Sequence, residues 1–299
     1  MNEVLLSVKN LRVSYFTRSG IIKAVDGVSF EVKKGETLGL TGESGCGKTT
    51  TALAILKLLA NAVIEGEVLF NGEDLLRKTE KELRLIRGRE ISMIFQESTG
   101  LNPVLKIGDQ IREVIKTPES SLDPIKLLRL VELPEPKILL NCYPHQLSSG
   151  MRQRVMIALA IASKPELVIA DEPTSMLDAT IQLQILNLLK RLKRELKLAM
   201  LLISHDLNIL KQICDNIAFM HAGKLIELYP TFEKPLHPHI RALPGISSSS
   251  LEIEDISPPR GCFYQKRCKY AELTCYVNEP EFREVKPGHF LSCHVRGGI

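Results

Sequence analysis

The stretch that decides the fold is Gly42-Glu43-Ser44-Gly45-Cys46-Gly47-Lys48-Thr49, because it fills every fixed position of the pattern G-x-x-x-x-G-K-[ST]. Residues 36–40 read as a strand before it and residues 48–59 as a helix after it. Glycines let the backbone N–H groups turn toward phosphate oxygens, and the helix start adds positive charge. We therefore predict a nucleoside triphosphate site: Lys48 reaches the β- and γ-phosphates, Thr49 binds Mg²⁺ and Thr50 touches the α-phosphate. The remaining loop residues expected at the phosphates are Gly42, Ser44, Gly45, Cys46 and Gly47.

A second motif, Leu167-Val168-Ile169-Ala170-Asp171-Glu172, places two carboxylates at the end of an apolar strand. In a parallel sheet such a strand end lies beside the nucleotide. We expect Asp171 to hold Mg²⁺ through water and Glu172 to polarise the attacking water. Paired acids can also cap the following turn, and the motif alone leaves that alternative open.

A third motif, Leu147-Ser148-Ser149-Gly150-Met151, precedes the apolar helix expected at residues 155–162. It resembles the signature of the ATP-binding cassette (ABC) ATPases, usually Leu-Ser-Gly-Gly, with Ser149 in place of the first glycine. The resemblance implies that Ser148, Ser149 and Gly150 approach the γ-phosphate of a nucleotide held by a second subunit. A Cβ at position 149 crowds that approach, so we expect two non-identical ATP sites.

The same resemblance assigns roles to four further residues. Tyr15 is expected to stack on adenine, and Asp178 to cross the dimer interface. Gln96 is expected to contact Mg²⁺ and the attacking water and to link the nucleotide to a membrane partner, and His205 to contact the γ-phosphate. The expected catalytic set is thus Glu172, His205 and Gln96. Packing in the core is the alternative for Tyr15, and capping is the alternative for Asp178, before a helix outlined by Ile185, Leu188, Leu189, Leu192 and Leu196.

Four of the seven cysteines lie near the end of the chain: Cys262, Cys268, Cys275 and Cys293. Thiols stay reduced inside cells, so the set indicates a metal or cluster site rather than disulfides. Buried unrelated thiols, or a zinc site with His289 and His294 nearby, are the alternatives. Together with residues 235–239, Pro-Leu-His-Pro-His, the spacing resembles the C-terminal extension of dipeptide and oligopeptide importer ATPases. That resemblance implies a [4Fe–4S] cluster on the four cysteines.

Pattern and composition divide the chain into two parts. The resemblance implies that residues 1–245 form an α/β domain of ABC nucleotide-binding type. It comprises a P-loop NTPase core with antiparallel β and helical subdomains, the helical one at about residues 97–161. Residues 246–299 are predicted to form a serine-containing linker and a small Cys-rich module that begins near Arg260.

Charge and hydropathy exclude several classes of protein. The formal net charge of +4 is mild and the basic residues alternate with acids, so no nucleic-acid partner is expected. The longest apolar run, residues 155–162, is much shorter than the roughly 20 residues that cross a bilayer. The N-terminus does not resemble a signal peptide, so we expect a chain that remains inside the cell.

The resemblance as a whole implies an ATPase on the cytoplasmic face of the cell membrane that powers import of di- and oligopeptides. It implies three kinds of partner: a second, related ATPase, two transmembrane permease subunits and an extracytoplasmic solute-binding protein. Import of nickel chelates or oligosaccharides by the same machinery is one alternative. A soluble ABC ATPase of DNA repair or translation is another, but such proteins usually carry two cassettes or a long coiled-coil insertion, and the sequence has neither.

Overall fold

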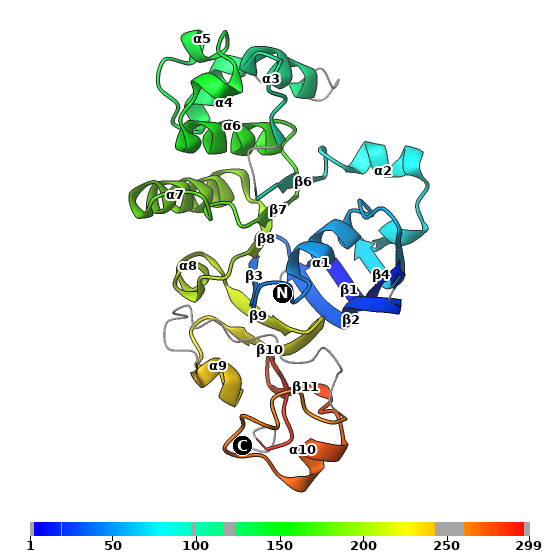
Figure 1. The fold of residues 1–299 in the computed structure, drawn as a ribbon. Helices are drawn as coiled ribbons and strands as arrows, with labels where there is room; N and C mark the ends of the chain where they lie inside the picture. The colour runs from blue at the N-terminus through cyan, green and yellow to red at the C-terminus, as the bar shows by residue number, and fades with distance from the viewer. Residues whose placement is uncertain (1–2, 19, 97–99, 116–122, 243–259, 296–299) are drawn as a thin grey trace.

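Two β-sheets form the body of the protein (Figure 1). The computed structural model describes residues 3–18, 20–96, 100–115, 123–242 and 260–295. The smaller, antiparallel sheet has the order β2-β1-β4-β5, with β1 (Val4–Thr17), β2 (Gly20–Lys33), β4 (Ala62–Phe70) and β5 (Glu73–Asp74). The larger sheet has the order β11-β12-β10-β9-β3-β8-β7-β6. Its strands are β3 (Thr37–Gly42), β6 (Ile91–Ile94), β7 (Leu167–Asp171), β8 (Ala199–Ile203), β9 (Asn216–His221), β10 (Lys224–Pro230), β11 (Phe282–Lys286) and β12 (His289–Ser292).

The centre of the large sheet is parallel, as the sequence predicts. Strands β6, β7, β8, β3 and β9 pair in parallel, whereas β10, β12 and β11 add antiparallel strands at one edge. Successive side chains of β8 alternate between two cores. Met200 and Leu202 pack with the helices α6 (Ser149–Ile161) and α7 (Ala179–Leu196). Leu201 and Ile203 pack with α1 (Lys48–Ile55) and the small sheet, so α1 is held between the two sheets.

Helix α1 is shorter than expected. The apolar residues up to Leu59 favour a longer helix, but α1 ends at Ile55 because Lys57 adopts a left-handed backbone with φ 51°. The N–H of Lys57 donates to the carbonyl of Ala54 and that of Leu58 to the carbonyl of Leu53, both at 2.9 Å. This pair of bonds is a Schellman motif, which satisfies the last carbonyls and stops the helix.

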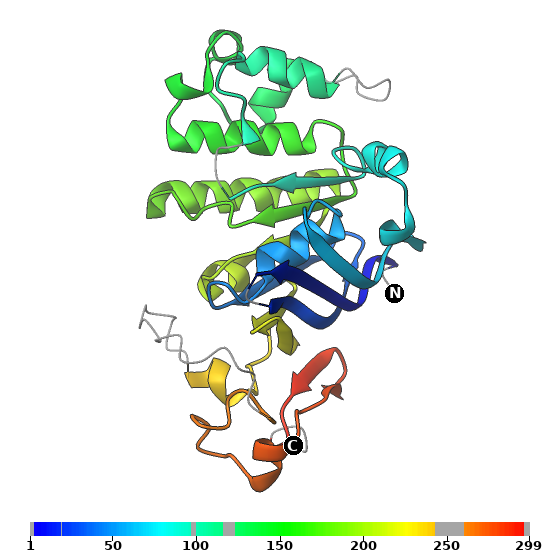
Figure 2. The same cartoon turned by 45° about the vertical axis from the view of Figure 1, so that its right-hand side comes forward.

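A helical lobe projects from the large sheet at the end where β6 and β7 lie (Figures 1 and 2). It contains α3 (Ile107–Ile115), α4 (Pro124–Leu130), α5 (Pro136–Leu139) and α6, and its core includes Ile107, Leu127 and Ile157. Two further helices, α2 (Glu80–Ile86) and α8 (Leu207–Ile213), flank the sheets. Helix α2 begins with a capping box in which Thr79 and Glu82 bond each other's backbone N–H groups. The helical pattern predicted after residue 97 therefore appears, although residues 97–99 and 116–122 lie outside the described part.

The C-terminal segment continues the large sheet. Strand β12 pairs with β10 through Glu227 opposite Leu291 and Leu228 opposite Phe290, and β11 pairs with β12. The segment also contains α10 (Leu273–Val277), and α9 (Pro238–Ala242) precedes it. A separate Cys-rich module is therefore not confirmed, because its strands complete the sheet of the nucleotide-binding part. Most of the expected linker, up to residue 259, lies outside the described residues.

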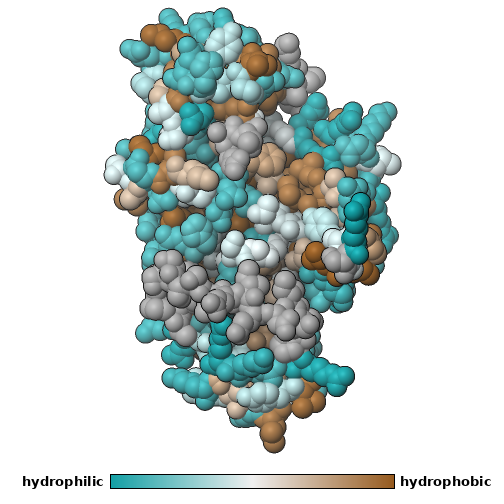
Figure 3. All heavy atoms as spheres, viewed as in Figure 1, coloured by the Kyte–Doolittle hydropathy of each residue, from teal (hydrophilic) through white to brown (hydrophobic). Residues whose placement is uncertain are grey.

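The surface is largely hydrophilic on the face drawn in Figure 3. Apolar side chains occur there in separate patches, one of them at the lower end over α10, where Leu273 and Val277 are exposed. Among the described residues, no helix combines the length and the apolar character needed to cross a membrane.

Candidate nucleotide site

Four parallel strands of the large sheet end at one edge, and a predicted site residue follows each of them. Strand β3 leads into the phosphate loop, β6 into Gln96 and β8 into His205, while β7 ends at Asp171. Because parallel strands share the same direction, their carboxyl ends meet. The sheet therefore brings together residues that are up to about 160 positions apart in the chain.

The phosphate loop curls tightly between β3 and α1. Gly42 and Gly47 have φ values of 145° and 104°, in the region that favours glycine. The Lys48 ammonium is buried and donates hydrogen bonds to the carbonyl oxygens of Gly42 at 2.9 Å and Glu43 at 2.8 Å. It therefore lies over the loop at the start of α1, where a phosphate would be bound by the backbone N–H groups.

The side chains of the loop differ in exposure. Ser44, Gly45 and Thr49 are exposed and Thr50 is half-buried, so all four border the open side of the loop. Cys46 is buried, and burial raises the pKa of its thiol although Lys48 lies beside it. A protonated, buried thiol is unreactive, so Cys46 contributes backbone geometry and packing.

Asp171 and Thr49 form the donor set that could hold Mg²⁺. The Asp171 side chain is buried, its Oδ1 has no hydrogen-bond partner, and burial raises the pKa of its carboxyl. A hydrogen bond with the Thr49 side chain opposes that rise. A buried carboxylate oxygen without a partner, beside a hydroxyl, is an arrangement of oxygen ligands that suits this hard cation.

Glu172 joins two other predicted catalytic residues. Its Oε2 accepts a hydrogen bond from Nε2 of Gln96 at 3.2 Å, and its Oε1 lies 3.3 Å from Nδ1 of His205. Glu172 has a left-handed φ of 44° and is fixed by the bond from its N–H to the Ile203 carbonyl at 3.0 Å. A non-glycine residue in this region costs about 1–3 kcal/mol, which such surrounding contacts must offset. The structure thus unites Glu172, Gln96 and His205, as the sequence predicts.

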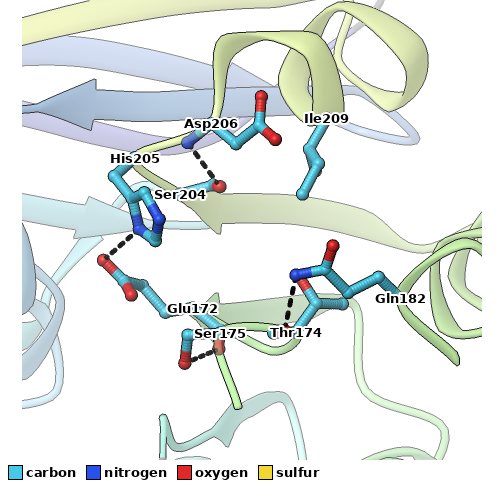
Figure 4. A pocket seen from close by; sticks show the side chains of 8 residues that line it. All are labelled: Glu172, Thr174, Ser175, Gln182, Ser204, His205, Asp206 and Ile209. Carbon is cyan, nitrogen blue, oxygen red and sulfur yellow. Dashed lines mark hydrogen bonds and ion pairs between the residues drawn. The ribbon is translucent and has the colours of Figure 1, made fainter. Parts of the chain in front are cut away.

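A small cavity of about 40 Å³ lies beside this group (Figure 4). In the figure Glu172 and His205 point toward each other on one side, and Gln182 lies opposite, donating to the Thr174 carbonyl at 2.9 Å. The cavity has room for water but not for a nucleotide. It therefore suits a water molecule held next to the Glu172 carboxylate.

The signature residues lie away from the phosphate loop of their own chain. Figures 1 and 2 place α6 in the helical lobe, whereas α1 lies between the sheets. Ser148 caps α6 by accepting a bond from the Met151 N–H at 3.3 Å, and Ser149 is exposed on the first turn. Gly150 is buried, and a Cβ there would lie 2.9 Å from Cγ2 of Ile181. A side chain at position 150 would therefore require Ile181 to move, whereas Ser149 is exposed within the single chain.

Asp178 and Tyr15 have the structural roles that the sequence left open as alternatives, helix capping and core packing. Asp178 accepts hydrogen bonds from the N–H groups of Thr180 and Ile181, which confirms that it caps α7. Tyr15 is half-buried on β1 and packs at the edge of the core. Contact of Asp178 with a second subunit and of Tyr15 with adenine remain predictions.

Comparison with known proteins agrees with this geometry. The family model described as ABC transporter matches residues 25–175. The oligopeptide transport ATP-binding protein OppD of Salmonella typhimurium is 41% identical over 313 residues, 97% of this chain and 93% of that protein. The chain belongs to the ABC transporter family. The dipeptide transport ATP-binding protein DppD of Bacillus subtilis is 42% identical over 319 residues, covering 98% and 95% of the two chains.

A solved structure of the family extends the comparison to the fold. The dimeric structure of MJ0796, a bacterial ABC transporter cassette, superposes with a TM-score of 0.68 and 29% identity. It covers 76% of this chain and 99% of that one. A structure of MJ0796 in a post-hydrolysis state, bound to ADP and Pi, matches equally well. The chain is accordingly an ABC-type ATPase with the P-loop NTPase fold.

The four C-terminal cysteines of this ABC ATPase lie close to one another. Burial raises the pKa of the Cys262 thiol to about 11, and the charges of the other three cysteines add to the rise. The Cys262 N–H also donates to the Cys275 carbonyl at 2.7 Å. Cys293, which directly follows β12, therefore lies near Cys262 although the two are 31 positions apart in the sequence.

The histidines proposed as zinc ligands are bonded elsewhere. The His289 ring is fully buried, with Nε2 2.7 Å from Oε1 of Glu227 and Nδ1 2.8 Å from Oε2 of Glu233. His294 bonds the Asn278 carbonyl through Nε2 at 2.9 Å. Both ring nitrogens of His289 are therefore occupied, which removes it as a ligand beside the cysteines.

His289 connects the C-terminal strand to the body of the cassette and is expected to make stability depend on pH. Burial alone lowers the pKa of His289, but the bonds and charges of Glu227 and Glu233 outweigh it and raise the pKa. The His289 imidazole therefore adds to the free energy of unfolding. This contribution is fully present below the pKa of histidine in the unfolded chain, near 6.5, and is lost as the pH rises through the pKa of His289 in the folded protein. His289→Gln is expected to lower the free energy of unfolding by about 3 kcal/mol at pH 6 and by less at pH 9.

The measurement is denaturant unfolding of the full chain between pH 6 and pH 9. His294→Gln is the matched control, because His294 bonds only to one described carbonyl at the surface. The control is expected to follow the wild-type pH profile. A pH-independent effect of His289→Gln would show that the ring acts by packing alone.

One group of side chains near the nucleotide site was not found from the sequence. Glu43 of the phosphate loop, His221 at the end of β9 and His239 of α9 converge. The register that sets Gly42 of β3 opposite Met220 of β9 makes Glu43 and His221 neighbours. In the sequence, His239 belongs to the Pro-Leu-His-Pro-His motif at residues 235–239, but no local pattern links it to Glu43 or His221.

Proposed function

We propose that this chain is the ATPase subunit of a binding-protein-dependent importer for di- and oligopeptides. The observation that carries the proposal is the identity of about 40% along nearly the whole chain with proteins named as oligopeptide and dipeptide transport ATP-binding proteins. The matched region includes the C-terminal segment as well as the nucleotide site. Import of nickel chelates or oligosaccharides remains the alternative cargo, since an ATPase subunit does not itself hold the cargo.

The proposed reaction is hydrolysis of ATP in a closed pair of cassettes. The phosphate loop and Lys48 would bind the phosphates, and Thr49 and Asp171 would hold Mg²⁺, which would supply positive charge to the phosphate oxygens. Glu172 accepts the proton of the attacking water, held in place by Gln96, and His205 orients the Glu172 carboxylate and reaches the γ-phosphate. Gln96 would also contribute its side-chain oxygen to holding Mg²⁺.

A second ATPase subunit completes each site. Ser148, Ser149 and Gly150 start a helix in the lobe remote from their own phosphate loop, so they are free to face the nucleotide of a partner. The exposed Ser149 then places a Cβ and hydroxyl at that interface, which supports a heterodimer with two unlike sites. Asp178 and Tyr15 are proposed to contact the partner and the adenine, respectively.

The remaining partners are two transmembrane permease subunits and an extracytoplasmic solute-binding protein, with the ATPase peripheral on the cytoplasmic face. Exposed apolar side chains of Phe95, Val104 and Leu105 flank Gln96 in sequence and offer a docking surface near the catalytic group. Docking there would couple closure of the ATP site to the permease through Gln96.

Reconstitution tests the proposal. The chain is co-purified with its membrane partners, placed in proteoliposomes and supplied with the solute-binding protein and candidate cargo. Peptide-loaded binding protein is expected to stimulate ATP hydrolysis, and nickel chelates or oligosaccharides are not. Stimulation by either of those instead would change the cargo, and activity without any membrane partner would favour a soluble ABC ATPase.

We further propose that Cys262, Cys268, Cys275 and Cys293 hold a [4Fe–4S] cluster with a structural role. Four thiols that lie near one another are a fitting donor set for iron. Zinc is less suited, because tetrahedral Zn–S bonds of 2.3 Å bring sulfurs within about 3.8 Å of each other. Among the described residues, no three cysteine sulfurs lie within 4.8 Å of one another. A cubane carries its thiolates on four separate irons and needs the wider arrangement.

Anaerobically purified protein is expected to be brown and to contain about four irons per chain. Cys262→Ser is expected to bleach it and to expose the C-terminal segment to protease while ATP binding persists. Cys142→Ser is the matched control, since Cys142 lies in the helical lobe with its thiol on the Ile138 carbonyl. Colourless protein with about one zinc per chain would overturn the cluster in favour of a zinc site.

A further inference from the structure

Three side chains meet beside the phosphate loop although they come from distant segments. Nδ1 of His221 lies 3.4 Å from Oε2 of Glu43, and Nε2 of His239 lies 3.5 Å from Oε1 of Glu43. One ligand atom from each residue lies within 4.8 Å of the others. His239 is 5% exposed, so the group is closed on the side of α9 and more open at Glu43 and His221.

The two ring nitrogens that face Glu43 lack hydrogen bonds. His221 Nδ1 and His239 Nε2 are buried atoms without a hydrogen-bond partner. The contact with His221 is close enough to lower the pKa of the Glu43 carboxyl, but its angles are not those of a hydrogen bond. Buried nitrogens are ordinarily satisfied, so two that converge on one carboxylate indicate an atom to be held between them.

The distances fit a tetrahedral metal site. Bonds of 2.0–2.1 Å to nitrogen and 2.0–2.2 Å to oxygen place neighbouring ligand atoms about 3.4 Å apart. The observed distances from the two histidine nitrogens to the Glu43 oxygens, 3.4 and 3.5 Å, match this separation between ligand atoms. Two imidazoles and one carboxylate form a donor set that zinc uses with its fourth position open to water. Imidazole nitrogen favours Zn²⁺ and related transition metals over Mg²⁺.

The surroundings keep the imidazoles in the form that binds metal. Burial, together with His221, lowers the pKa of His239 to about 4, so its ring is neutral at physiological pH. Phe263 stacks on the His221 ring with centroids 4.1 Å apart, and Tyr264 lies 4.8 Å from the His239 ring. The Arg267 charge also reaches the group, but its side chain is exposed and has solvent beside it.

We propose that Glu43, His221 and His239 bind one Zn²⁺ or a similar transition-metal cation, with the fourth position open. The site would join the phosphate loop to β9 and α9. Its aromatic cover, Phe263 and Tyr264, directly follows Cys262, so the site would also hold the C-terminal segment against the nucleotide site. Because the Glu43 carbonyl accepts a bond from Lys48, metal binding would fix the loop that positions this lysine.

Metal titration of the full chain tests the site. Chelator-treated protein is titrated with Zn²⁺ and the bound metal is counted, for the wild type and for His239→Gln. The variant is expected to lose one zinc equivalent, or to bind it at least about 100-fold more weakly. Any zinc on the cysteines is common to both proteins and cancels in the comparison. His145→Gln, at an exposed histidine of the helical lobe, is the control and is expected to bind as the wild type does.

A second variant covers the risk that His239→Gln fails to fold. Glu43→Gln changes a half-buried side chain by one atom and is expected to cause the same loss of zinc. Bound Co²⁺ is expected to give weak visible bands in the wild type that both variants lose, without the intense thiolate absorption that the cysteines would add. Equal zinc stoichiometry and affinity in the wild type and both variants would overturn the proposal.

Discussion

Replacement of Glu172 by glutamine is expected to slow ATP hydrolysis by about 10²- to 10⁴-fold, the usual contribution of a positioned general base. The amide keeps the size of the side chain and its contact with Gln96, but it cannot accept a proton from water. ATP binding is expected to persist, because Lys48, Thr49 and Asp171 are unchanged. The measurement is turnover of the assembled transporter beside nucleotide binding by the same preparation.

The matched control for this change is Glu195→Gln on the exposed face of α7. It removes the same charge far from the catalytic group and is expected to leave turnover unchanged. A slow Glu172→Gln variant that still binds ATP would separate chemistry from binding. Turnover near that of the wild type would refute Glu172 as the base and leave it the role of a cap on the turn after β7.

The nucleotide site could be predicted because its residues follow buried strands. Apolar runs such as β7 identify strands by composition alone, and parallel order then brings their ends together. Glu172, Gln96 and His205 therefore meet as expected. The cluster of Glu43, His221 and His239 could not be predicted in this way. Its members depend on which strand neighbours β3 and on where α9 folds back, and neither is encoded in a local pattern.

The ends of elements and the C-terminal segment were harder to predict. The end of α1 depends on one left-handed residue, Lys57, which has no glycine-like signal. Strand β12 is short and joins β10 through backbone bonds that any sequence can make. The buried ring of His289 between Glu227 and Glu233 secures that pairing, and only the folded structure shows it.

Among glycine-to-alanine substitutions in the phosphate loop, Gly42→Ala is expected to lower the free energy of unfolding the most. Gly42 has a φ of 145°, and a Cβ there would lie 2.1 Å from the Met220 carbonyl oxygen and 2.8 Å from the Cys46 sulfur. The oxygen belongs to the backbone of β9, so no side-chain rotation relieves the clash. We expect the free energy of unfolding to fall by at least about 3 kcal/mol and ATP binding to be lost with the loop geometry.

Gly45→Ala separates the clash from the backbone preference. Gly45 also has a positive φ, 77°, but a Cβ there meets no atom within 4 Å. Its cost is expected to be the left-handed penalty alone, about 1–2 kcal/mol. Denaturant unfolding of the two variants side by side measures the difference. If both variants unfolded alike, the close packing of β3 against β9 would not be what requires glycine at position 42, and its conformation alone would be the reason.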